Sequence, residues 1–329
     1  MPRLGSLRAG GRDGKLVVIS ADGPRRMASA SVPTLQRALE EWDASLPELE
    51  RLTYELDGGG GEPLSTELLH AALPRAYQWC EGSTYLTHME RCRAARGAAL
   101  PPGHGTDPAV LQGASDRFLA PTAAIVLGDE AWGLDIEVTV AVIVGDVPQG
   151  VGEDAAAACV RLVLLANDLT LRNVLPAEFA KGLGLFQAKP LRPLSPIAVT
   201  VDDLGDAWDG RLLHASARVW INDLQLGNLR TGEDASFDFG QVISHAARTR
   251  PLAAGTVVGS GTVSNRDPSR GYGCLAEKRA TEILDLGEAT TPFLSAGDTV
   301  RIDAVDRAGR DLFGVMDAEV VLAAGGGAR

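Results

Sequence analysis

An alternation of polar and apolar residues over positions 134–144 predicts a strand of a β-sheet that buries one face. Its period of two places Asp135, Glu137, Thr139 and Ala141 on one side and four branched aliphatic residues on the other. A plain core strand would carry more Val or Ile in place of the acids. Half-buried carboxylates are costly unless cations or a metal ion pair with them. We therefore interpret this strand as part of an active site.

A second predicted strand, residues 161–172, shows the same feature. Its alternation places Asp168, Thr170 and Arg172 on one face, and Lys189 follows in the next segment. The acid and the arginine could belong to the same active site as Glu137. They could equally form a surface ion pair, and the pattern alone leaves both interpretations open.

The rest of the pattern predicts an α+β chain that is predominantly β. Apolar residues over 32–56 recur at helical spacing, with an interruption at Pro47. The pattern after about residue 195 predicts strands separated by Gly-rich turns. A flexible GGGGEP run at 58–63 precedes a change in composition near residue 73. We expect a small N-terminal α+β domain over 1–72 and a catalytic domain over 73–329. Other expected elements are a strand at 15–19, a short helix at 153–159, a helix capped by Ser236 or Asp238, and a C-terminal hairpin.

The segment after residue 73 contains an acid and a histidine at helical spacing. Glu81 and His88 are seven residues apart, which on one continuous helix would place them on the same face about two turns apart. The alternative is a capping acid and a surface histidine. The loop at 97–120, rich in Pro and Gly, contains His104 as a candidate substrate contact.

Composition and charge exclude several classes of function. A net charge of -12 and the absence of a basic run with interleaved aromatic residues disfavour nucleic acid as a partner. The sequence has no window of about 18 uncharged apolar residues and no apolar signal-peptide core near its first residues, so we expect a cytoplasmic protein that does not enter a membrane. The four cysteines lack CxxC spacing, so we expect reduced, small apolar residues without a zinc knuckle or a disulfide framework.

Five segments together carry a resemblance that spans nearly the whole chain. The sequence resembles the fumarylacetoacetate hydrolase superfamily, especially bacterial members of this length with a small N-terminal domain. The segments are WCEGSTYLTH at 79–88, LDIEVTVAVI at 134–143, LLANDLTLRN at 164–173, GLGLFQAKPLRPLSPIAVT at 182–200 and RPLAAGTVVGSGTVSN at 250–265.

The resemblance implies a mixed β-sheet roll around a divalent cation, Mg²⁺ or else Mn²⁺ or Ca²⁺, in a homodimer. It places four positions on the metal: Glu81, Glu137, Thr139 and Asp168. It implies that His88 is the catalytic histidine, that Glu277 orients it, and that Lys189 and Arg172 bind the substrate carbonyl groups. Tyr85, Thr262 and His104 are the expected substrate contacts.

The sequence departs from the family pattern at two metal positions. Thr139 stands where a second Glu is expected, and Glu81 stands where an Asp is usual. The metal would therefore have three carboxylates in place of four, and we expect it to bind weakly. Asp135 lies about 7 Å from Glu137 along a strand, and we do not expect it to compensate.

This residue set suits cleavage of a carbon–carbon bond beside a carbonyl. A hard cation polarises the carbonyl, and His88 activates water. The first hypothesis is a divalent-metal-dependent hydrolase of a small β-diketo or 2-oxo acid. The second is a recruited paralogue whose weakened metal site serves decarboxylation, isomerisation, dehydration or cyclisation. The third is a non-catalytic binding protein that has lost the metal.

Overall fold

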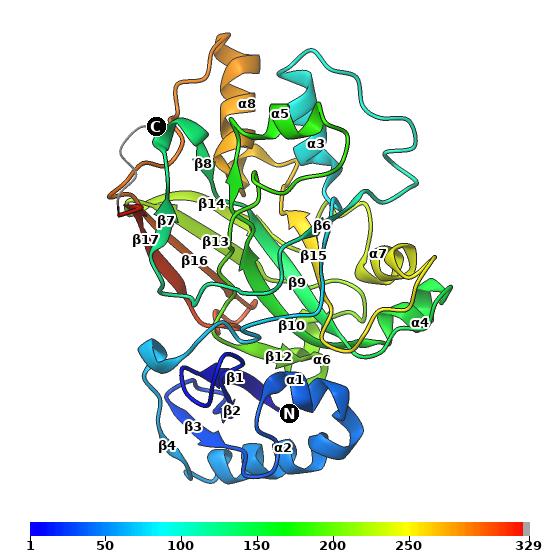
Figure 1. Ribbon diagram of the computed structural model, residues 1–329, viewed down its shortest axis with the longest axis vertical. Helices are drawn as coiled ribbons and strands as arrows, with labels where there is room; N and C mark the ends of the chain where they lie inside the picture. Colours follow the sequence, from blue (N-terminus) through cyan, green and yellow to red (C-terminus); the bar gives the residue numbers. More distant parts are fainter. Residues whose placement is uncertain (325–329) are drawn as a thin grey trace.

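A computed structural model describes residues 1–324 and shows a small N-terminal unit packed beneath a larger strand-rich unit (Figure 1). The fold class is α+β and predominantly β, as the sequence predicts. A sheet in the order β4-β3-β2-β1-β12-β10-β9-β15-β5-β6 runs through both units, and a second has the order β14-β13-β16-β17-β7. Within the described residues no helix has both the length and the apolar character that crossing a membrane requires.

The N-terminal unit packs two helices against its strands. The helices are α1 (Leu35–Glu40) and α2 (Trp42–Asp57). The predicted interruption at Pro47 is wrong: the break falls at Glu41, and Pro47 lies inside α2. Burial of the α2 leucines in the core explains why the helix persists, because most helical stability in proteins comes from packing of an apolar face. The strands are β1 (Arg3–Leu7), β2 (Lys15–Ile19), β3 (Arg25–Ala28) and β4 (Glu62–Pro63).

The larger unit centres on the antiparallel pair β9 (Val138–Val144) and β10 (Val160–Asn167). Both are fully or nearly fully buried runs of aliphatic residues. On the other side of β9 lies β15 (Val257–Thr262), which runs parallel to β5 (Trp79–Gly82). The other strands are β6 (Val110–Gly113), β7 (Ile125–Leu127), β12 (Ala198–Thr200), β13 (Ser216–Ile221), β14 (Leu224–Arg230), β16 (Thr299–Val305) and β17 (Met316–Leu322).

The two acidic strands predicted from the sequence are each broken in the structure. Residues 134–144 divide into β8 (Leu134–Asp135) and β9, and residues 161–172 divide into β10 and β11 (Thr170–Leu171). The breaks face each other, because the Asp168 N–H donates to the Glu137 carbonyl at 2.9 Å and β8 pairs with β11. Glu137 and Asp168 therefore leave the regular ladder at the same place.

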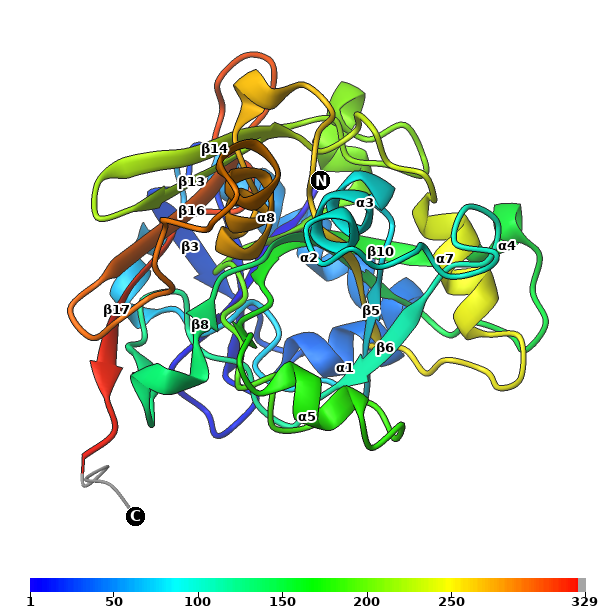
Figure 2. The same cartoon turned by 90° about the horizontal axis from the view of Figure 1, so that it is seen from above.

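Two helices stand side by side above the main sheet (Figure 2). They are α3 (Leu86–Ala94) and α8 (Leu275–Leu286). The expectation of one helix joining Glu81 to His88 is wrong, since Glu81 lies on β5 and His88 on α3. The chain turns from strand to helix at Ser83–Tyr85, so helical spacing does not relate the two residues.

The remaining helices surround the sheets. The expected short helix is α4, Asp238 caps α7 in a capping box with Gln241, and β16 and β17 form the C-terminal antiparallel pair. These helices are α4 (Glu153–Ala157), α5 (Leu175–Phe179), α6 (Val201–Leu204) and α7 (Phe239–Ala246). Short 3₁₀ segments cover Thr66–Leu68, Glu130–Trp132, Gly205–Ala207 and Pro268–Arg270.

Candidate active site

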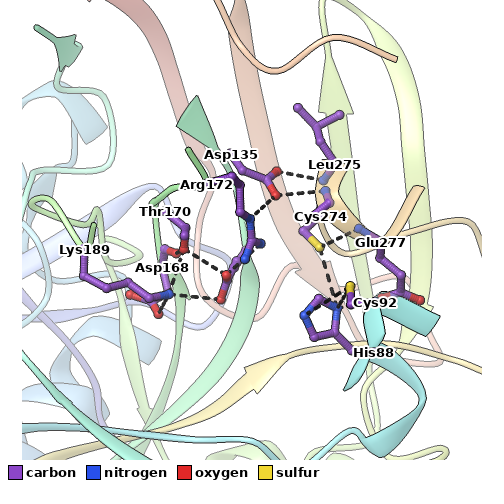
Figure 3. A network of polar contacts seen from close by, with 12 residues as sticks. His88, Cys92, Asp135, Asp168, Thr170, Arg172, Lys189, Cys274, Leu275 and Glu277 are labelled. Atoms are coloured by element: carbon purple, nitrogen blue, oxygen red, sulfur yellow. Dashed lines mark hydrogen bonds and ion pairs between the residues drawn. The ribbon is translucent and has the colours of Figure 1, made fainter. Parts of the chain in front are cut away.

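Lys189 lies at the centre of a buried cluster of acids and cations (Figure 3). Its Nζ donates to Asp168 Oδ2 at 2.7 Å, to the Thr170 hydroxyl at 2.7 Å and to Glu137 Oε2 at 3.3 Å. These contacts use all three ammonium protons. The break between β10 and β11 positions Asp168 and Thr170 for this contact, so the sequence prediction that they share a face is consistent with the structure.

Arg172 connects this cluster to helix α8. Its Nη2 lies 2.8 Å from Glu137 Oε1, and its Nε donates to Asp135 Oδ2 at 2.8 Å. Asp135 also accepts the backbone N–H groups of Leu275 at 2.7 Å and Ala276 at 2.9 Å. Asp135 therefore caps α8 and is fully engaged there, which agrees with the expectation that it does not replace a metal ligand.

Arg192 is a buried member of the cluster that the sequence analysis missed. Its side chain is 1% exposed, its Nε lies 2.7 Å from Asp168 Oδ1, and its guanidinium stacks over Trp79 at 4.6 Å. A surface ion pair between Asp168 and Arg172 is the wrong interpretation, because Asp168 is buried and pairs with Lys189 and Arg192. The only sequence signal was a second cation three residues after Lys189.

These ion pairs keep the cluster charged. Burial raises the pKa of Glu137, but Lys189 and Arg172 outweigh it and hold that pKa well below its ordinary value. Burial lowers the pKa of Lys189, but Asp168 and Glu137 outweigh it and the net shift is upward. Both side chains are therefore ionised at neutral pH.

Glu81 differs from the other acids because it lacks a cationic partner. Its Oε1 accepts from the Thr139 hydroxyl at 3.4 Å, and its buried Oε2 has no hydrogen-bond partner among residues 1–324. Gly259 provides the space for this carboxyl, since a Cβ there would lie 2.4 Å from Oε2. Burial, reinforced by the Asp168 charge, raises the pKa of Glu81 well above its ordinary value.

The donors in this cluster fit a hard divalent cation in kind. Three carboxylates and the Thr139 hydroxyl supply oxygen atoms, and the unpartnered Glu81 Oε2 is the group that a cation would satisfy. The fit is loose, because Glu137 and Asp168 already pair with cations. In the described part of the chain, the ligand atoms of the three carboxylates do not all lie within 4.8 Å of one another. The residues that meet this limit are His88, Cys274 and Glu277. Closing the carboxylates around an ion therefore requires movement of a side chain.

A histidine–carboxylate dyad lies beside the cluster, between α3 and α8. His88 Nδ1 lies 3.1 Å from Glu277 Oε2. The other oxygen, Glu277 Oε1, accepts from Arg91 at 2.5 Å and from the Ser264 hydroxyl at 2.8 Å. Glu277 is fully buried, so its position is fixed. In the tautomer that donates from Nδ1 to Glu277, the imidazole Nε2 is the atom that can accept a proton.

Two thiols surround His88. Cys274 Sγ lies 3.7 Å from Nδ1, and Cys92 Sγ lies 3.9 Å from Nδ1. Burial lowers the pKa of His88, but negative charge on the Cys92 and Cys274 sulfur atoms and hydrogen bonds to them outweigh burial, and the net shift of the His88 pKa is well upward. The cysteines are free, as expected, but the description of Cys92 and Cys274 as merely apolar is wrong because both contact the imidazole.

The expected substrate contacts occupy three different environments. Tyr85 is buried and donates its hydroxyl to the Thr231 carbonyl at 2.5 Å. Thr262 ends β15 and pairs in register with Thr139, whose hydroxyl contacts Glu81. His104 lies in the loop after α3, where its Nδ1 is 3.0 Å from the Pro101 carbonyl. Their roles as substrate contacts stay predictions.

Comparison with known protein families identifies the larger unit. The model described as fumarylacetoacetate (FAA) hydrolase C-terminal matches residues 78–321, most of the chain. The chain belongs to the fumarylacetoacetate hydrolase family. The model described as fumarylacetoacetase N-terminal domain 2 matches residues 2–75 of this family member. The boundary expected after residue 72 stays a prediction.

Relatives of this family member have several activities. A curated 2,4-didehydro-3-deoxy-L-rhamnonate hydrolase from Sphingomonas sp. (strain SKA58) is 27% identical over 188 residues, which are 55% of this chain and 61% of that protein. A maleylpyruvate hydrolase from Sphingobium sp. SYK-6, solved with manganese(II) and pyruvate, has a TM-score of 0.64 at 17% identity and covers 98% of this chain and 100% of its own. A 5-carboxymethyl-2-hydroxymuconate delta-isomerase from Mycobacterium smegmatis has a TM-score of 0.61 at 18% identity. The match covers 98% of this chain and 99% of the isomerase. These relatives are named as two hydrolases and one isomerase.

Proposed function

We propose that the protein is a divalent-metal-dependent hydrolase that cleaves a carbon–carbon bond of a small β-diketo or 2-oxo acid. The observation that carries this proposal is the pairing of His88 with the buried Glu277 beside the Lys189 cluster, with Arg172 between them. A positioned base and a set of fixed cations are the two requirements for adding water to a carbonyl and stabilising the enolate that leaves. The cations also favour an anionic substrate.

His88 performs the proton transfers in this proposal. Glu277 accepts the Nδ1 proton, so Nε2 takes a proton from water as the water oxygen bonds to the substrate carbonyl carbon. The carbon–carbon bond then breaks, its electron pair passes to the leaving carbon as an enolate, and the imidazolium returns a proton to that carbon. Water is consumed and His88 is regenerated.

Lys189 binds the oxygen that gains negative charge. Because its three protons are all engaged, a substrate oxygen must replace one partner, and Glu137 at 3.3 Å is the longest of the three contacts. Glu81, Glu137 and Asp168, with the Thr139 hydroxyl, would hold a divalent cation whose chemistry is polarisation of the same carbonyl group.

The substituted metal position supports a second candidate function. Thr139 supplies a neutral oxygen where the family pattern has a carboxylate, and three cations already pair with Glu137 and Asp168. A paralogue with this cluster could use its cations to stabilise an enolate in decarboxylation, isomerisation, dehydration or cyclisation without adding water.

One experiment separates these functions. The purified protein is incubated with a panel of 2,4-dioxo and 2-oxo acids in ¹⁸O-labelled water, with and without Mg²⁺ or Mn²⁺, and the products are weighed by mass spectrometry. Hydrolysis gives two fragments, one carrying the label in its new carboxylate. Loss of carbon dioxide, loss of water or a product of unchanged mass would support the second function, and no turnover by folded protein would overturn both. The homodimer stays a prediction that light scattering tests.

A Thr139→Glu variant tests the metal position. The variant restores a fourth carboxylate, so we expect Mg²⁺ or Mn²⁺ to raise its melting temperature at lower metal concentrations than in the wild type. Thr139→Gln is the matched control, because it adds the same bulk without the charge. If neither variant changes the metal response, position 139 does not contact the metal. Thr139→Asp serves as a smaller variant, since Thr139 is fully buried.

The pH dependence of the rate tests His88 as the base. Its raised pKa means that the imidazole is protonated and inactive at low pH, and that kcat/KM rises as the pH passes through a value above the ordinary histidine pKa. Glu277→Gln removes a negative charge beside the imidazolium, so the midpoint of this rise should move to lower pH. An unchanged midpoint would show that another group titrates.

A further inference from the structure

The proposed reaction gives no role to the two thiols beside His88. Cys92 lies one helical turn after His88 on α3, and Cys274 is the N-cap of α8, where its Sγ accepts the Glu277 N–H at 3.4 Å. Helix capping by cysteine is unusual, because Ser, Thr, Asp and Asn are the preferred caps. Two helices from distant parts of the sequence therefore deliver an imidazole, a carboxylate and two sulfur atoms to one point (Figure 3).

The spacing of these atoms is that of ligands around a tetrahedral ion. Metal–ligand bonds of 2.0–2.3 Å at tetrahedral angles separate neighbouring ligand atoms by about 3.3–3.8 Å. From His88 Nδ1, Glu277 Oε2 lies at 3.1 Å, Cys274 Sγ at 3.7 Å and Cys92 Sγ at 3.9 Å. The ligand atoms of His88, Cys274 and Glu277 all lie within 4.8 Å of one another. Cys92 is outside this group of three, although its Sγ also lies 4.0 Å from His88 Nε2.

The surroundings of the cluster support metal binding. Arg91 and Ser264 hold Glu277 Oε1, which leaves Oε2 directed at His88 in the way that outer partners orient a ligating carboxylate. Burial raises the pKa of Cys92, but His88 outweighs it and the net shift is downward, toward the thiolate. Burial raises the pKa of Cys274 to about 12, so this thiol needs a bound cation to lose its proton.

The donor types select a different metal from that of the carboxylate cluster. Thiolate and imidazole ligands suit Zn²⁺, whereas Mg²⁺ and Mn²⁺ prefer oxygen. We propose that His88, Cys274 and Glu277, with Cys92 or a water molecule as the fourth ligand, form a second metal site for a thiophilic divalent cation such as Zn²⁺, and that its binding inhibits the enzyme. The inhibition rests on the proposed role of His88, because a metal on Nδ1 replaces the hydrogen bond from Nδ1 to Glu277 and fixes the imidazole. The binding of the metal does not rest on that role.

Cobalt(II) titration tests the binding without any assay of activity. Metal-free protein receives Co²⁺, and we expect the near-ultraviolet absorption of thiolate-to-cobalt charge transfer to saturate at one equivalent. Cys274→Ser should abolish this absorption, and Cys92→Ser should reduce it. Cys159→Ser is the matched control, because Cys159 Sγ donates to the Ala155 carbonyl at 3.2 Å at the end of α4, and its replacement should leave the spectrum unchanged. Absence of the absorption in the wild type, or its persistence in Cys274→Ser, would overturn the site.

Zinc inhibition then tests the second half of the proposal. With Mg²⁺ in excess, one equivalent of Zn²⁺ should lower turnover at least tenfold in the wild type, and Cys92→Ser, compared with its own zinc-free rate, should need more Zn²⁺ for the same loss. Thermal melting establishes that each variant is folded. If cobalt binds but zinc does not inhibit, the inhibitory role is overturned while the site stands. If zinc inhibits but His88→Ala is fully active, the proposed function fails on its own.

Discussion

Replacing His88 by alanine is expected to lower kcat by about 10²–10⁴-fold, the usual contribution of a positioned general acid–base group. The imidazole is held by a buried carboxylate, and no other histidine within residues 1–324 contacts Glu277. Steady-state kinetics on whichever acid the protein turns over measures the effect. KM should change much less than kcat, because His88 acts on water and binds no charged group of the substrate.

The control for this variant is His214→Ala. His214 pairs with Asp209 at 2.7 Å near the surface and lies outside the candidate site. Its replacement should leave kcat within a factor of about two, while both proteins keep a cooperative thermal transition. Full activity of folded His88→Ala would remove the dyad from the mechanism and leave the cations of the Lys189 cluster as the catalytic groups.

Replacing Arg192 by methionine is expected to lower the free energy of unfolding by about 3–5 kcal/mol, as for removal of one partner from a buried ion pair. Arg192 and Asp168 are each 1% exposed, and the guanidinium also stacks on Trp79. Methionine fills similar apolar volume, so the loss reports mainly the uncompensated charge of Asp168. Urea unfolding at neutral pH measures it.

Arg51→Met is the matched control for this loss. Arg51 pairs with Glu55 on the exposed side of α2, and such pairs on helix surfaces contribute about 0.2–0.5 kcal/mol. If Arg192→Met is as mild as this control, Lys189 alone is sufficient to compensate Asp168.

The sequence predicts the fold and the kinds of residue in the candidate site better than it predicts which of those residues contact one another. Periodicity identifies β2, α4, the Asp238 cap and the C-terminal hairpin, because each depends on local residues. It does not show that the acidic strands break at Glu137 and Asp168, since a period of two continues through both breaks. That break is set by a hydrogen bond between the two segments.

Contacts that join distant segments could not be predicted. Arg192 reaches Asp168 only because the chain after Lys189 returns to the end of β10, and Cys274 lies 186 residues from His88. The position of Glu81 next to Gly259 likewise depends on the parallel pairing of β5 with β15. A resemblance to a family indicates which residues meet, but burial and pairing of each charge come from the structure.

The shared ten-stranded sheet has a consequence for dividing the protein. β1 pairs with β12, β12 pairs with β10, and Arg3 donates to the carbonyl groups of Asp311 and Leu312 from within the interface. A fragment starting at residue 78 would expose the backbone of β12 as an open edge, the kind of surface that recruits foreign strands and aggregates. A chimera between two relatives must therefore take the N-terminal unit and the β12 strand that pairs with it from the same parent protein.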